Sequence, residues 1–267
     1  MEPWIVVGLL WLVFGGTHIL LTTRRLRSAL VGALGPWGFT FLYSIIATVT
    51  LAWLIHELAV GYDQGAAGPA LGRFPGVQIA GIVVIVAGVV LMIAAFFALP
   101  ASTLPRLGAQ RFEVRGLERV TRHPFFVGIA LLGLAHALLA TKLVGTVGFG
   151  GLALFSIAGA LHQDAKLRAE LGEAYARYLR ATSMVPFGAI LAGRQQLFAS
   201  ELPWTGFATG LVLVFALWSV HDSILAREGL WAILVIAVGP TLATIATYVQ
   251  RRRASSRRAE RHAAVSR

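Results

Sequence analysis

The sequence contains no cysteine and few charged residues. Of its 267 residues only 13% are Asp, Glu, Lys or Arg, whereas 57% are hydrophobic. The absence of cysteine excludes disulfides, thiolate haem ligation, iron–sulfur clusters and cysteine-based zinc sites. The shortage of charge is too great for a soluble domain of this length. The composition therefore predicts a protein embedded in a lipid bilayer.

Apolar runs along the chain approach or reach the length of a transmembrane helix, which needs about 20 residues to cross the hydrocarbon. We count seven such runs, of which the fourth and fifth are short and joined by a tight turn. The sequence therefore predicts an all-α, polytopic transmembrane helix bundle of about seven spans. The runs are residues 4–21, 39–59, 77–99, 124–141, 143–161, 204–221 and 229–248.

Acidic residues are outnumbered, and the formal net charge is +11. The distribution of the basic residues argues against nucleic acid as a partner. Twenty of the 23 lysines and arginines lie on alternate connections, and the other connections hold only Arg73, Lys142 and Arg227. The positive-inside rule predicts this pattern for a multi-pass protein whose N-terminus is outside and whose C-terminus is cytoplasmic. We expect the protein in the bacterial inner membrane.

The expected organisation has three parts. Residues 1–198 form a membrane core, residues 199–248 a C-terminal transmembrane hairpin, and residues 249–267 a basic cytoplasmic tail that touches anionic lipid. The first apolar run lacks a charged n-region and a small-residue cleavage site, so we interpret it as a retained span. The sequence shows no Walker motif, Gly-rich nucleotide fingerprint or catalytic triad.

Histidines are the candidate functional residues. An ionisable side chain inside a membrane helix is costly and therefore suggests a function, and imidazole is a common ligand of metals and of haem iron. His18 and His136 are flanked by apolar residues inside spans. His123 and His162 lie with His18 near the cytoplasmic boundary, and Pro124 pushes His123 towards an extended backbone.

Three further histidines have simpler interpretations. His56 and His221 lie at the outer boundary beside the acids Glu57 and Asp222, so we expect an interfacial role for both, and His262 lies in the tail.

The first span presents His18 on one face together with three residues at helical spacing. A glycine on that face permits close approach of a helix or of a flat ligand. These three residues are Trp11, Phe14 and Gly15.

Several short motifs occur in a fixed order, and taken together they are specific. On them the sequence resembles the NnrU family of membrane proteins and, more distantly, the plant zeta-carotene isomerases, over about residues 1–198. The motifs are Gly16-Thr17-His18, Arg24-Arg25-Leu26-Arg27, Tyr43-Ser44, Thr121-Arg122-His123-Pro124 with Gly128, Leu134-Ala135-His136, Asp164-Ala165-Lys166-Leu167, Gly172-Glu173, Thr182 to Phe187 and Gly193-Arg194-Gln195.

The resemblance to the isomerases implies a haem b protein whose two axial histidines match His18 and His136. It implies isomerisation of an apolar polyene or a redox role, in which the iron acts on a conjugated substrate held against Trp11 and Phe14. NnrU proteins are also associated with the reduction of nitrite and nitric oxide. Where the isomerases carry a histidine pair in the fifth span, this chain has Phe155-Ser156.

Other interpretations remain open. With a rise of about 1.5 Å per residue, His136 lies about 18 Å from the cytoplasmic start of its span, whereas His18 lies only about 5 Å from the cytoplasmic end of its own span. Depth therefore favours pairing His18 with His123 or His162. Two motifs, Arg122-His123-Pro124-x-x-x-Gly128 and Tyr175-Ala176-Arg177-Tyr178, also resemble the isoprenylcysteine and phospholipid methyltransferases. This resemblance implies S-adenosylmethionine at the cytoplasmic face, with Arg122, His123 and Tyr178 around the cofactor. A third hypothesis is a non-enzymatic membrane assembly factor. The sequence leaves the substrate and the oligomeric state open.

Overall fold

The computed structural model describes residues 1–98, 114–224, 229–230 and 232–234 of the chain. Within them the chain is helical, and the one β-bridge joins Ala67 to Lys142. This confirms the prediction of an all-α multi-pass membrane protein, although the run 229–248 lies almost wholly outside the described residues. Four helices are long and apolar enough to span a membrane, α1 (Pro3–Leu20), α2 (Arg24–Gly61), α3 (Pro75–Ala98) and α6 (Leu143–Leu171), and two apolar helices are shorter, α5 (Pro124–Leu139) and α9 (Trp204–Ser219).

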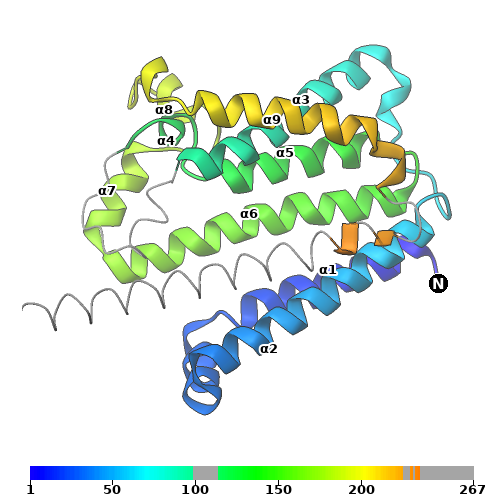
Figure 1. The fold of residues 1–267 in the computed structure, drawn as a ribbon, viewed down its shortest axis with the longest axis horizontal. Coiled ribbons are helices and arrows are strands. Elements are labelled where there is room, and N and C mark those ends of the chain that lie inside the picture. Colours follow the sequence, from blue (N-terminus) through cyan, green and yellow to red (C-terminus); the bar gives the residue numbers. More distant parts are fainter. Residues whose placement is uncertain (99–113, 225–228, 231, 235–267) are drawn as a thin grey trace, which may run out of the picture.

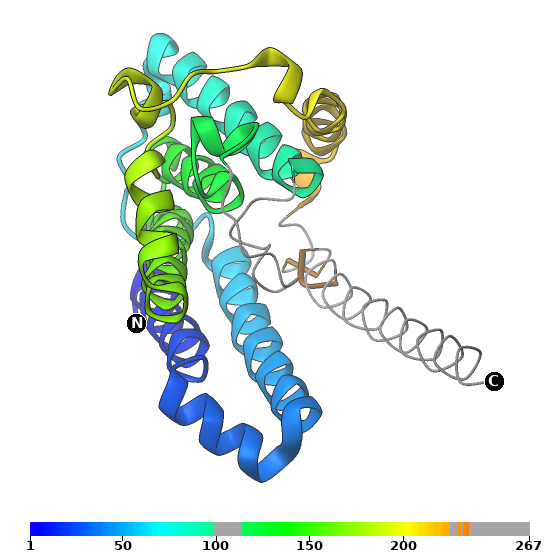
Figure 2. The same ribbon diagram turned by 90° about the vertical axis from the view of Figure 1, so that its left-hand side faces the viewer.

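The long helices pack side by side in a continuous series. Helix α5 packs against both α3 and α6, α9 packs against α3, and α1 packs against both α6 and α2. Figures 1 and 2 show the result, in which α6 separates the α1–α2 hairpin from α5. Helix α6 is therefore the element that contacts both candidate histidine helices, α1 and α5.

Glycine permits the closest of these helix crossings. Where α3 meets α5, a Cβ on Gly88 would lie 2.7 Å from the carbonyl oxygen of Gly128, and a Cβ on Gly128 would lie 2.5 Å from that of Gly88. The two backbones are thus in direct contact, as small residues allow between membrane helices. Where α5 meets α6, a Cβ on Gly133 would lie 2.7 Å from the carbonyl oxygen of Phe149.

Helix α2 is bent near its start. Gly35 has φ 72° and is followed by Pro36, so the segment that begins at Arg24 is a separate helical piece. Large apolar side chains beyond the bend are exposed, among them Phe41 at 70%, and the lipid bilayer is the environment that such a surface suits.

The C-terminal end of α6 is polar and is followed by a turn and a short helix. Helix α6 continues to Leu171, beyond the apolar run 143–161, Gly172 then turns the chain with φ 56°, and α7 (Glu173–Ala181) follows. This positive φ is not helical, so it ends α6, and glycine adopts it more readily than other residues. The remaining short elements are η1 (Leu71–Arg73), α4 (Leu117–Val120), α8 (Gly188–Leu191), η3 (Ala199–Glu201) and η4 (His221–Ser223).

Candidate functional site

His18 lies in a cluster of aromatic rings between α1, α2 and α6. Its ring centroid is 5.2 Å from that of Phe14, 4.9 Å from Tyr43 and 5.4 Å from Phe155. Phe14 is buried and also contacts Phe155 at 5.0 Å. The structure thus brings together an imidazole, a phenol and two phenyl rings from three helices.

The two nitrogens of His18 differ. Nε2 is 2.6 Å from the hydroxyl of Tyr43, whereas Nδ1 is the one buried side-chain nitrogen or oxygen in the described part of the chain that has no hydrogen-bond partner. If Tyr43 donates, Nδ1 carries a proton without an acceptor. If Tyr43 accepts, Nδ1 carries a lone pair without a donor. Either arrangement costs about 1–3 kcal/mol, so the site calls for an explanation.

Trp11 and Gly15 fix α1 against α6 beside this cluster. The indole Nε1–H of Trp11 donates to the carbonyl oxygen of Gly148 at 3.0 Å, and its ring lies so close to Gly151 that a Cβ there would be 2.3 Å away. A Cβ on Gly15 would touch the ring of Phe155 at 3.4 Å. The face of α1 predicted from helical spacing therefore meets α6.

His136 has different neighbours. Its ring centroid is 4.7 Å from that of Phe149 on α6 and 6.3 Å from that of His221 on η4. Its Nδ1–H donates to the carbonyl oxygen of Leu132 at 2.9 Å. That bond fixes the tautomer in which Nε2 keeps its lone pair, as in histidines that bind metals.

A buried polar network occupies the end of α6 beyond its apolar stretch. Asp164 is 8% exposed. Its Oδ1 accepts hydrogen bonds from His123 Nε2 at 2.8 Å and from the hydroxyl of Tyr175 at 2.7 Å, and its Oδ2 accepts from Arg122 Nε at 2.9 Å. One carboxylate thus joins α5 and its N-cap to α6 and α7.

The charges in this network determine the pKa of Asp164. Burial alone would raise it, but the hydrogen bond and charge of His123, with the bond from Tyr175 and the charge of Arg122, together hold the pKa of Asp164 below its usual value. Burial and the adjacent carboxylate raise the pKa of Tyr175. The carboxylate is therefore the charged partner, and Tyr175 is a neutral donor.

A second buried acid extends the network. Glu118 is 4% exposed and accepts a hydrogen bond from the hydroxyl of Tyr178 at 3.1 Å. Burial, together with Glu118, raises the pKa of Tyr178. On the surface nearby, Arg119 forms an ion pair with Glu201 at 2.8 Å, and this bond, with the N–H of Gly116, lowers the pKa of Glu201 to about 2. These contacts attach α4 to α7 and η3.

The network bears on the methyltransferase hypothesis. His123 is 2% exposed, and His123 and Arg122 direct their donors to Asp164, so the polar atoms that a cofactor would need are used within the protein. His162 is half-buried and forms no hydrogen bond or ion pair within the described residues. The structure does not place it in contact with His18.

Comparison with known proteins connects these sites to a family. A model of the family described as "NnrU protein" matches residues 6–250, nearly the whole chain. The chain belongs to the NnrU family. The match continues past residue 198 and includes His221.

Curated relatives of this NnrU-family protein carry an enzyme name. The 15-cis-zeta-carotene isomerase of Zea mays is 39% identical over 82 residues, and that of Arabidopsis thaliana is 38% identical over 82 residues. The aligned part is 31% of this chain and 22% of each relative. The chain therefore matches about a fifth of the length of these isomerases. No solved structure matches significantly.

Haem, which the resemblance implies, can be tested against the residues present. The donor chemistry fits at each histidine singly, because His18 has an unpartnered buried Nδ1 and His136 keeps a lone pair on Nε2. The ring neighbours of His18 and His136 have no member in common, and α6 lies between their helices. Direct pairing of the two across one iron remains a prediction.

Sequence reasoning missed three side chains of these sites. Tyr43 was part of a motif but had no assigned role, Tyr175 had no motif that marked it as a partner of Asp164, and His221 was interpreted as interfacial because Asp222 follows it. Only Tyr43 carried a signal, since an interior hydroxyl near an intramembrane histidine needs a partner. Within the described ranges, no group of three or more His, Asp or Glu side chains is placed to hold a metal ion.

Proposed function

We propose that this NnrU-family protein is a membrane-embedded isomerase that changes the geometry of a double bond in an apolar polyene, at a site built around His18. The isomerase names of the curated relatives support the reaction class. The observation that carries the proposal is the buried Nδ1 of His18, which has no partner and lies among aromatic rings.

The surroundings of His18 suit a flat conjugated ligand. Phe14 and Phe155 supply apolar ring surface, and Tyr43 holds the imidazole through Nε2 and so sets its orientation. A polyene offers no hydrogen-bonding groups, so its binding depends on apolar contact, which these rings provide. Nδ1 is then the polar atom left for a cofactor or for a charge that develops along the polyene.

Haem b is part of this proposal, and His18 and His136 are the residues to hold its iron. A bound haem would supply an iron that polarises the conjugated chain or exchanges an electron with it, which lowers the barrier to rotation about a double bond. Tyr43 would orient the ring of His18, and Leu132 O would orient that of His136. The same histidines would serve the nitrogen-oxide chemistry that the resemblance implies.

The test is an assay of the isomer ratio. The full chain is purified in detergent, incubated with 15-cis-zeta-carotene, and the isomer ratio is measured by chromatography. We expect His18→Ala to lower the rate at least tenfold and Tyr43→Phe to lower it less, whereas His56→Ala, a histidine at the outer end of α2, retains the wild-type rate. Equal rates in wild type and His18→Ala, or no reaction above the protein-free control, would reject the isomerase.

A further inference from the structure

His221 is placed beside His136 by the tertiary fold. It lies in η4, directly after α9, whereas His136 lies in the last turn of α5. Their ring centroids are 6.3 Å apart and their planes differ by 21°. Because α9 packs against α3 and α3 against α5, the end of α9 reaches the same end of the bundle as the end of α5, as Figure 1 shows.

Both rings direct Nδ1 to an oxygen. His136 Nδ1 is 2.9 Å from the carbonyl oxygen of Leu132, and His221 Nδ1 is 3.5 Å from Oδ1 of Asp222, within the range of an ion pair. Metal-binding histidines in proteins have this arrangement, in which a carbonyl or carboxylate holds one nitrogen and the other faces the ion. In each ring Nε2 is the nitrogen available to a ligand.

The separation of the rings also suits a shared ion. Two imidazoles on opposite sides of one metal have ring centres about 6 Å apart, since metal–nitrogen bonds are about 2.0 Å long. The ring of Phe149, on α6, stacks on that of His136, and the side chain of His221 is 60% exposed. An exposed ring can rotate quickly and present Nε2.

We propose that His136 and His221 ligate the same transition metal at this end of the bundle. The shared chemistry is imidazole nitrogen on a metal, and the metal is either haem iron or a free divalent ion that reaches exposed His221 from solution. The proposal does not depend on the proposed isomerase activity. If the metal is haem iron, His221 takes the place that the resemblance gives to His18 as the partner of His136, so the two ligand pairs exclude each other.

The experiment measures metal and not turnover. The full chain is purified in detergent, its iron and zinc contents are determined, and oxidised and reduced absorption spectra are recorded. Metal-depleted protein is then titrated with Zn²⁺ alone. The variants are His221→Ala, His136→Ala and, as the matched control, His56→Ala, which removes another imidazole next to an acid.

Two results support the proposal. If the metal is haem iron, His221→Ala shifts the spectrum from a six-coordinate to a five-coordinate form, and His136→Ala alters it as well. If the metal is a free ion, one equivalent of Zn²⁺ binds to the wild type, and affinity falls at least tenfold in both variants. His56→Ala changes neither spectrum nor affinity. His221 is exposed, so His221→Ala is expected to keep the wild-type unfolding temperature.

The opposite result is equally clear. A spectrum and a Zn²⁺ affinity that are the same in His221→Ala and wild type, with no metal bound or with metal bound elsewhere, would overturn the shared site and leave two neighbouring rings. The failures are distinguishable: a wild type without isomerase activity that still loses Zn²⁺ in His221→Ala would reject the proposed function and keep the metal site.

Discussion

At the scale of the residue, the carboxylate of Asp164 is the group on which most of the buried polar contacts depend. It accepts from His123, Tyr175 and Arg122 on the elements around it. Removing one member of a buried ion pair leaves the other charge buried without a partner. The stability lost in this way exceeds the net stability that the pair contributes. Asp164 is therefore the most sensitive position in this network.

We predict that Asp164→Asn destabilises the protein by about 3 kcal/mol, because it removes the negative charge and places the amide NH2 against donors on one side, either those of His123 and Tyr175 or that of Arg122. The matched control is Glu173→Gln, which removes an acid paired with Arg180 on the exposed surface of α7, where little effect is expected. Thermal unfolding in detergent measures both. Comparable effects of the two substitutions would show that Asp164 does not hold these elements together.

The low pKa of Asp164 also predicts acid sensitivity. The group binds a proton less readily when folded than when unfolded, so its stabilising contribution is present above its unfolded pKa of about 3.9 and is lost as pH falls through the lower folded pKa. The unfolding temperature of the wild type should therefore decrease below about pH 4, and that of Asp164→Asn should decrease less. Parallel curves for the two proteins would contradict this origin.

The sequence located the face of α1 but not what meets it. Helical spacing places Trp11, Phe14, Gly15 and His18 on one side, and the structure packs that side against α6. Spacing along one helix carries no information about a second helix, so the bond from His18 to Tyr43 and the place of Phe155 could not be derived. The partners of Asp164 were unpredictable for the same reason.

At the scale of the element, the crossing of α3 and α5 depends on glycine. We predict that Gly128→Ala destabilises the protein by about 1–3 kcal/mol, because its Cβ would lie 2.7 Å from the backbone nitrogen of Met92 and would separate the helices. The control is Gly16→Ala on α1, where a Cβ meets nothing within 4 Å. There the change should be neutral or favourable by up to about 1 kcal/mol.

Unfolding in denaturing detergent compares these two alanines directly. The prediction is wrong if Gly128→Ala and Gly16→Ala behave alike.

Element ends were predicted closely where proline or a loop marks them, as for α5, which begins at Pro124 as expected. The end of α6 was predicted less well, because the polar residues after residue 161 end the apolar run but not the helix, which continues to Leu171.

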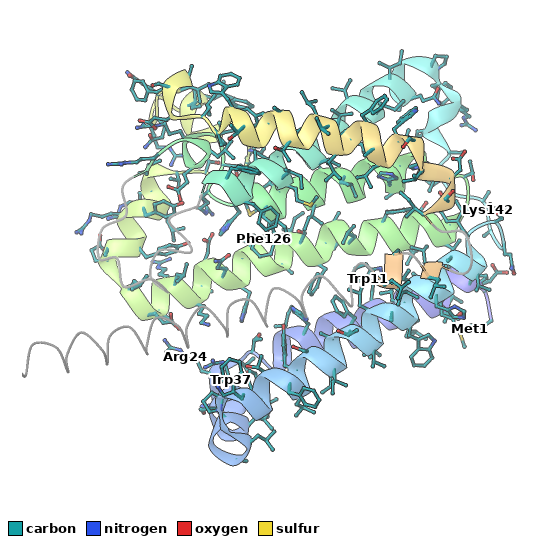
Figure 3. The ribbon with its side chains drawn as sticks, in the orientation of Figure 1. Met1, Trp11, Arg24, Trp37, Phe126 and Lys142 are labelled. Carbon is teal, nitrogen blue, oxygen red and sulfur yellow. The ribbon has the colours of Figure 1, made fainter. Side chains whose placement is uncertain are left out.

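At the scale of the whole molecule, connections between the helices lie at two opposite ends of the bundle. Figure 3 shows Met1 and Lys142 at one end and Arg24 with Trp37 at the other. Because each span reverses the direction of the chain, the alternation of basic connections predicts that the end with Arg24 faces the cytoplasm, and this orientation stays a prediction. Hydropathy revealed the number of apolar runs, but it could not show that α9 returns His221 to His136, which depends on packing between distant helices.

The absence of cysteine provides a direct test of orientation, since any introduced thiol is unique. We predict that Gln64→Cys, after α2, reacts with a membrane-impermeant maleimide in right-side-out vesicles, whereas Ser28→Cys, in the basic segment before the bend of α2, reacts only after permeabilisation. Both residues are exposed and flank the spanning part of α2. About 26 residues of helix separate the bend from the end of α2, enough for about 39 Å and therefore for one crossing. Labelling of Ser28→Cys alone would invert the orientation, and labelling of both without permeabilisation would exclude α2 as a span.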